Sequence, residues 1–171
     1  MGLLITFFLV SIFFSFLCSI LEAVLLSITP AYVGIQEQEE TSVAKDLANF
    51  KEDIDKPLAA ILTLNTIAHT VGAIGVGSQA STIFGSTSLT VFGLALISWE
   101  ALIAGVMTLA ILILSEVIPK TIGANNWERL TPLTVKTLKV LLFLLSPLIW
   151  ISQSITRNLK KEKNKPVLSR T

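Results

Sequence analysis

The chain has 171 residues, of which 52% are hydrophobic and 15% are charged, and its mean hydropathy is +0.74. Because soluble domains carry about 25% charged residues, and because the chain has apolar runs of about twenty residues, the composition indicates an integral membrane protein in a lipid bilayer. The net charge of +1 excludes nucleic-acid binding driven by overall charge, and the single cysteine, Cys18, excludes an intramolecular disulfide.

The first predicted span covers residues 3–28, and its only charged residue is Glu22. Ser11, Ser15, Ser19 and Glu22 follow at spacings of four, four and three, which places them on one helical face. No Lys or Arg precedes the apolar run, so we expect it to be a retained span and not a secretory leader. After Pro30, the pattern predicts an amphipathic surface helix from Glu37 to Lys51.

The second predicted span covers residues 58–84 and has no formal charge. Asn65, His69 and Gly72 share one face at spacings of four and three. Small residues such as Gly72 are typical of close helix packing in lipid. Residues 85–98 are expected to form an outer loop or a partly embedded segment.

The third predicted span covers residues 101–118 and ends in an acid, a proline and a lysine. Ser115 supplies a hydroxyl and Glu116 a carboxylate, and Pro119 frees the carbonyl of Ser115, four residues back. These are hard oxygen ligands of the kind that Mg²⁺ and Ca²⁺ prefer. We therefore predict a cation site around Glu116. Two other interpretations stay open, a protonated Glu116 and an ion pair with Lys120 at i+4.

The remaining sequence predicts a polar turn over residues 119–129, an interfacial helix over 130–155 and a basic tail over 157–171. Ten Lys and Arg follow residue 119, whereas residues 85–98 have none. The positive-inside rule then places the N-terminus outside and the C-terminal part in the cytoplasm. The predicted fold is all-α, with three transmembrane helices and a juxtamembrane belt helix.

Polar side chains from the three spans are predicted to converge on one interior. Glu22 and Glu116 both lie toward the cytoplasmic ends of their spans, and two carboxylates at one depth repel unless a cation or a proton lies between them. Less specific roles stay open for several of these residues. The serines can bond their own helix backbone, Asn65 can join helices, and His69 suits helix–helix bonding or proton sensing.

Three segments resemble the transmembrane domain of the cyclin M / CorC magnesium transporters: Ser19-Ile20-Leu21-Glu22-Ala23, Asn65-Thr66-Ile67-Ala68-His69-Thr70-Val71-Gly72 and Ser115-Glu116-Val117-Ile118-Pro119-Lys120. The resemblance implies a homodimer that holds Mg²⁺ in a cavity open to the cytoplasm, with Na⁺ as the coupling ion. It places Ser19, Asn65 and Glu116 at family ion-site positions and Glu22 at that of a family acid. Ser115 and His69 depart from the Gly and Asn that many members have there.

The resulting hypothesis is plasma-membrane Mg²⁺ transport, with Na⁺-coupled export as the expected direction. The alternative is a Mg²⁺-binding sensor or scaffold subunit that moves no ion. No hydrolase motif appears among the residues, so we expect no enzymatic activity. Family members usually continue into a nucleotide-sensing CBS pair, and we expect any nucleotide binding to belong to that region, beyond Thr171.

Overall fold

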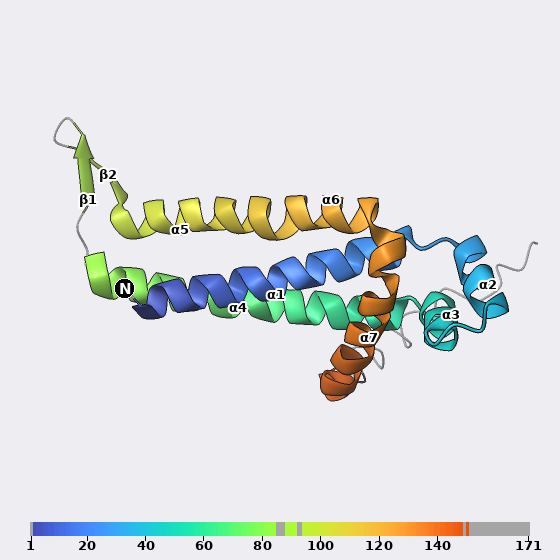
Figure 1. Cartoon of the computed structure of the whole chain (residues 1–171). Helices are drawn as coiled ribbons and strands as arrows, with labels where there is room; N and C mark the ends of the chain where they lie inside the picture. The colour runs from blue at the N-terminus through green and yellow to red at the C-terminus, as the bar shows by residue number, and fades with distance from the viewer. Residues whose placement is uncertain (1, 85–87, 92–93, 149, 151–171) are drawn as a thin grey trace, which may run out of the picture.

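Three long rods lie side by side in the structure, a computed structural model that describes residues 2–84, 88–91, 94–148 and 150 (Figure 1). The first rod is α1 (Gly2–Ser27), and the second is α4 (Asp55–Phe84), which runs antiparallel to it. The third rod joins α5 (Trp99–Ile111), the π-helical turn η1 (Leu112–Val117) and α6 (Ile118–Asn125). α1 contacts both of the other rods.

Each rod contains a stretch that is long and apolar enough to cross a membrane. The stretches are Gly2–Ser27, Asp55–Ile83 and Thr108–Asn125. Their outward side chains include exposed Leu9, Ile74 and Leu109, which suits a surface covered by lipid. The prediction of an all-α membrane protein with three spans is therefore confirmed.

A short hairpin joins the second and third rods at one end of the bundle (Figure 1). Strand β1 (Ser88–Val91) pairs antiparallel with β2 (Leu94–Ser98), with an irregularity in register between Leu89 and Thr90. This hairpin occupies the segment for which the sequence predicted a loop or a partly embedded stretch.

Two short helices, α2 (Pro30–Gln38) and α3 (Ala44–Glu52), lie at the opposite end. The prediction of one continuous helix from Glu37 to Lys51 is therefore wrong. Glu40 has a positive φ of 50°, and the Thr41 amide and hydroxyl both bond Gln36, at 3.2 and 2.9 Å. This local turn gives the backbone carbonyl of Gln36, at the end of α2, a hydrogen-bond partner, and it reverses the chain direction before α3.

The predicted polar turn over residues 119–129 is also largely helix. Pro119 lies in the first turn of α6, where a missing N–H costs no hydrogen bond. The wide turn before it absorbs the steric clash that proline causes inside an α-helix, and Ile118 N–H bonds Ile113 O, five residues back. The chain turns only at Asn126.

The last described helix, α7 (Trp127–Leu144), leaves the bundle axis and runs across the rods (Figure 1). It begins three residues before the predicted interfacial helix at 130. Residues 149 and 151–155 of that predicted helix, and the whole predicted basic tail over 157–171, lie outside the described part of the chain. A buried core joins α7 to α1, α3 and α4, with Leu21, Leu47 and Leu138 among its members. An ion pair of 2.9 Å between Lys139 Nζ and Asp46 Oδ2 also ties α7 to α3.

Candidate ion site

A hydrogen-bonded cluster of Ser15, His69 and Ser115 joins the three rods midway along the bundle. Ser15 Oγ lies 2.6 Å from His69 Nε2 and 2.9 Å from Ser115 Oγ. Ser115 Oγ also lies 2.6 Å from the Ile111 carbonyl, which can only accept. α1, α4 and η1 each contribute one residue, so the cluster fixes how the three rods are rotated against one another. Sequence analysis ranked Ser15 and His69 below the main candidates, and the structure places both at this junction.

Ser19 and Asn65 lie one helical turn beyond this cluster, toward the end with the charged residues. Ser19 follows Ser15 by four residues, and Asn65 precedes His69 by four on the antiparallel helix α4. One turn of helix advances about 5.4 Å, so the two residues occupy the same level on facing helices. Helix geometry therefore supports the predicted convergence of Ser19 and Asn65.

Both of these residues have a buried oxygen without a partner. Ser19 Oγ and Asn65 Oδ1 are inaccessible to solvent and accept no hydrogen bond from any described residue. Such an atom costs about 1–3 kcal/mol relative to a hydrogen-bonded one. A cation is one ligand that satisfies two convergent oxygens at once.

Glu116 lies at the level of the Ser15–His69–Ser115 cluster, one helical turn from this pair of oxygens. It follows Ser115 directly on η1, its side chain is 30% exposed, and its Oε1 lies 4.0 Å from His69 Nε2. A π-helical turn widens the backbone here, a distortion that is frequent at functional sites. The site thus combines one partly exposed carboxylate with buried hydroxyl and amide oxygens.

The Ser15 cluster and the Ser19–Asn65 pair lie at two successive levels along the bundle. Glu22 lies at a third level, one turn beyond Ser19, and forms an ion pair with Lys120. Lys120 Nζ lies 3.2 Å from Glu22 Oε2 and 3.4 Å from Oε1. The structure thus gives Glu22 and Glu116 different partners, contrary to the expectation that a shared cation or proton separates them. The reason is that Lys120 lies one turn beyond Glu116 and faces α1, which also argues against the alternative Glu116–Lys120 pair.

Gly72 lies on α4 three residues after His69, where α4 packs closely against α1. A Cβ on Gly72 would collide with the Ser11 side chain, whose hydroxyl bonds the Ala68 carbonyl at 2.9 Å. Gly72 therefore allows α1 and α4 to approach, as the glycine pattern suggested. Ser11 is buried and lies one turn before Ser15, on the polar face that the spacing of the serines predicted.

Within the described residues, no three His, Cys, Asp or Glu side chains come together as a metal cluster. The oxygen set of Ser19, Asn65 and Glu116 instead suits a hard cation.

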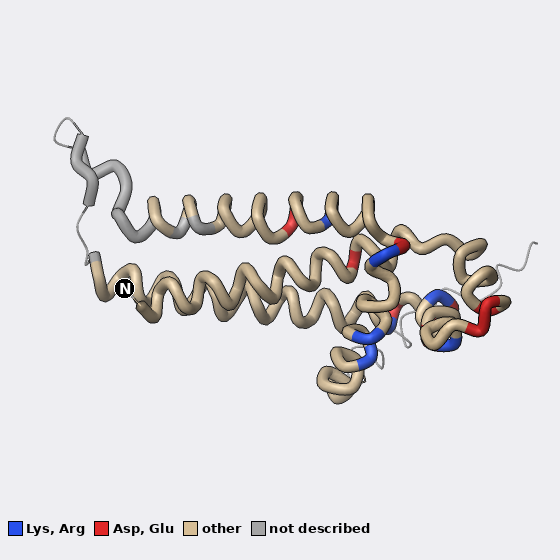
Figure 2. Tube along the Cα trace, in the orientation of Figure 1, with Lys and Arg blue, Asp and Glu red and all other residues tan. Residues whose placement is uncertain are grey.

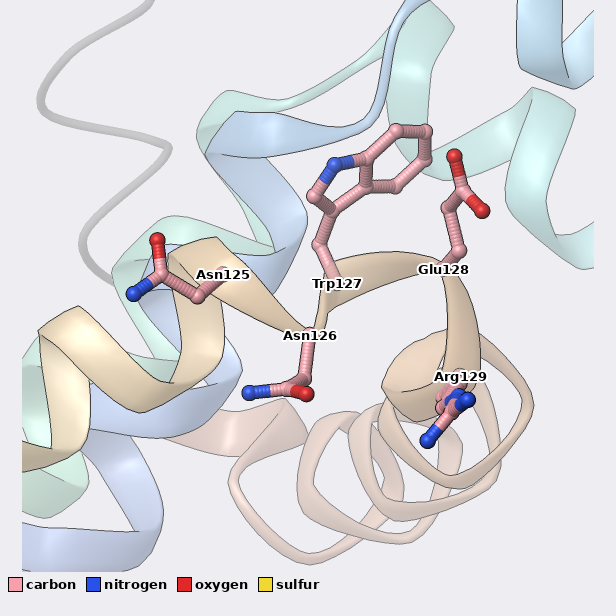
Figure 3. Close-up of a pocket in the computed structure, with 5 residues that line it drawn as sticks. All are labelled: Asn125, Asn126, Trp127, Glu128 and Arg129. Atoms are coloured by element: carbon pink, nitrogen blue, oxygen red, sulfur yellow. The ribbon is translucent and has the colours of Figure 1, made fainter.

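A separate polar cleft of about 400 Å³ lies at the corner between α6 and α7 (Figure 3). Its lining residues are Asn125, Asn126, Trp127, Glu128 and Arg129. It contains none of the predicted ion-site residues, so the cleft and the three levels described above are different places in the molecule.

The fold and the site define the class of protein as an integral membrane protein with three spans and a polar junction between them. Residues 4–171 match the family described as the cyclin M transmembrane N-terminal domain, and the chain belongs to this family. The resemblance to this family is thereby confirmed.

Several relatives share this similarity. The chain is 27% identical to the UPF0053 protein sll1254 of Synechocystis sp. over 88% of its own length, and 26% identical to a UPF0053 protein of Haemophilus influenzae over 81%. It is 31% identical to the UPF0053 inner membrane protein YfjD of Escherichia coli over 53% of its length. The matched parts make up 40%, 30% and 22% of these relatives, respectively.

Proposed function

We propose that this chain is the membrane domain of a magnesium transporter that exports Mg²⁺ across the plasma membrane in exchange for Na⁺. The observation that carries the proposal is the pair of unpartnered buried oxygens on Ser19 and Asn65, one turn from Glu116's level on neighbouring rods. The family membership of the chain supports a metal ion as the cargo.

The donor set suits Mg²⁺ because that ion takes oxygen ligands and gives up its water reluctantly. Glu116 supplies charge, Ser19 and Asn65 supply neutral oxygens, and retained water completes the shell. Because Lys120 already neutralises Glu22, Glu116 is the carboxylate left to attract the cation. Ser115 acts through the cluster that holds η1 against α1, and we propose it as a positioning residue.

Export of Mg²⁺ requires a source of free energy. Moving two positive charges out against an inside-negative potential of 100 mV costs about 4.6 kcal/mol. Entry of Na⁺ down its own gradient supplies this energy, so we propose Na⁺ as the coupling ion. We also retain the predicted homodimer as part of the proposal.

Mg²⁺ flux from proteoliposomes that contain the purified chain, with and without a Na⁺ gradient, tests the proposal. We expect Na⁺-dependent flux for the native sequence and its loss in Glu116→Gln. The matched control is Glu37→Gln, which removes an exposed carboxylate on α2 and should leave the flux unchanged.

The same preparation separates transport from sensing. Mg²⁺ binding without flux in either direction would favour the alternative of a sensor or scaffold subunit. Equal flux in the native chain and in Glu116→Gln would contradict the assignment of Glu116 as an ion ligand.

A further inference from the structure

The side of α7 that faces away from the bundle is apolar over most of its length. The inward side is buried and consists of Thr131, Thr134, Val135, Leu138 and Leu141. The outward side includes Leu133, Val140, Phe143 and Leu144, which are 60–84% exposed. Exposed apolar surface of this extent on one helix face marks an interaction surface.

Two cations share this outward side. Arg129 and Lys136 are both exposed and lie seven residues apart, which is about two helical turns. Among the described residues neither forms an ion pair, whereas Lys139 is paired with Asp46. Figure 3 shows the Glu128 side chain pointing in a different direction from that of Arg129. The outward face of α7 therefore combines apolar side chains with uncompensated positive charge.

The position of α7 places this face at a membrane surface. α7 runs across the three spans at the end of the bundle where the charged residues of the described chain gather (Figures 1 and 2). A helix transverse to the spans lies in the membrane plane, with its apolar side chains at the acyl boundary and its cations at the level of the headgroups. Cations at this depth attract anionic lipids.

We propose that the outward face of α7 binds anionic phospholipid, with Arg129 and Lys136 contacting the headgroup phosphate and Leu133, Val140 and Phe143 contacting the acyl chains. A second copy of the chain fits this face less well. A twofold contact across the middle of α7 would bring the same cations together without an acid between them.

Native mass spectrometry of the full chain, released from bilayers that mix phosphatidylglycerol with phosphatidylcholine, tests this proposal. We expect the native protein to retain phosphatidylglycerol selectively. Arg129→Gln combined with Lys136→Gln should lower that selectivity by about thirtyfold, because each cation near an anionic surface contributes about fivefold. Lys45→Gln is the matched control, because it removes an exposed cation on α3, away from this face, and should retain the selectivity.

Measurements on the unaltered protein keep the test valid if the double variant does not fold. Raising the ionic strength should weaken the phosphatidylglycerol selectivity of the native chain, and inorganic phosphate should not displace the lipid. Selectivity that is unchanged by salt, or equal in the native chain and the double variant, would overturn the proposal. So would a change from dimer to monomer in Phe143→Ser with lipid selectivity intact, since the face would then join two copies.

Discussion

The unpartnered oxygens of Ser19 and Asn65 lower the stability of the metal-free protein, but they are available to bind a cation. Each has a buried oxygen that no described residue satisfies, and such atoms are rare in native structures. Ser15, one turn away on the same helix, differs because its hydroxyl is bonded to both His69 and Ser115. The two serines therefore form a matched pair in which only the environment of the oxygen differs.

Ser19→Ala should leave the thermal stability of the metal-free protein unchanged or raise it, because it removes an unsatisfied oxygen and little volume. The same change should weaken Mg²⁺ binding. Ser15→Ala should instead lower the unfolding free energy by about 1 kcal/mol, because it removes the hydrogen bond of His69 Nε2 and one of the two hydrogen bonds of the Ser115 hydroxyl. Thermal unfolding of both variants with and without Mg²⁺ is the measurement. Equal destabilisation by the two substitutions would show that the Ser19 hydroxyl is satisfied in the protein.

The Glu22–Lys120 pair predicts a coupling between α1 and α6. Lys120→Met and Glu22→Gln should each cost less than about 1 kcal/mol, because Lys120 is 44% exposed and the pair is partly solvated. The exchanged variant, Glu22→Lys with Lys120→Glu, should recover part of that loss. A double-mutant cycle by thermal unfolding measures the coupling, and strictly additive effects would mean that the pair contributes nothing.

Sequence analysis found the candidate residues but not all of their partners. Helical spacing was enough to place Ser19 with Glu22 and Asn65 with His69, because residues at i, i+3 and at i, i+4 share a helical face. It could not show that Lys120 reaches Glu22 and leaves Glu116 near His69. That choice depends on the rotation of each helix about its own axis, which is set by contacts such as Ser15–Ser115 between distant segments.

At the scale of elements, the approach of α1 and α4 depends on Gly72. Gly72→Ala should destabilise the protein by about 1–3 kcal/mol, because the added methyl group would overlap Ser11. Gly77→Ala is the control in the same helix, where an added Cβ meets nothing within 4 Å and helix propensity favours alanine. Thermal unfolding of the two variants should therefore shift in opposite directions. Equal shifts would argue against close packing at Gly72.

The third rod continues as helix to Asn125, whereas the sequence predicted that its helix ends at residue 118. A proline after an apolar run normally indicates the end of a helix, and the polar residues from Lys120 to Asn126 strengthened that interpretation. The π-helical turn of η1 accommodates Pro119, so the helix continues to Asn125. Because a single wide turn leaves little trace in hydrophobic periodicity, sequence analysis could predict the special role of this stretch but not its form.

At the scale of the whole molecule, charge separates the two ends of the bundle (Figure 2). The three spans and the crossing helix were predictable, because apolar length and the positions of Lys and Arg are direct physical constraints. The cytoplasmic placement of the charged end stays a prediction, as does the dimer. Which residues of the three rods lie side by side in the site was not predictable, because this alignment is set only when all three rods pack together.

Cysteine labelling tests the predicted orientation. Cys18 is fully buried, so the native chain should not react with a membrane-impermeant maleimide. Glu37→Cys places a thiol on α2 at the charged end, and it should react only after the membrane is opened. Reaction in intact cells would place that end outside and would reverse the proposed direction of transport.

The binding of Mg²⁺ to the purified native chain and to Glu116→Gln, measured by calorimetry, tests most directly whether the three rods build a cation site. We expect the native chain to bind Mg²⁺ and the variant, which keeps the shape of the side chain but loses its charge, to show no measurable binding. Equal affinity in the two proteins would contradict the account, because Mg²⁺ would then bind without the Glu116 carboxylate, one helical turn from Ser19 and Asn65.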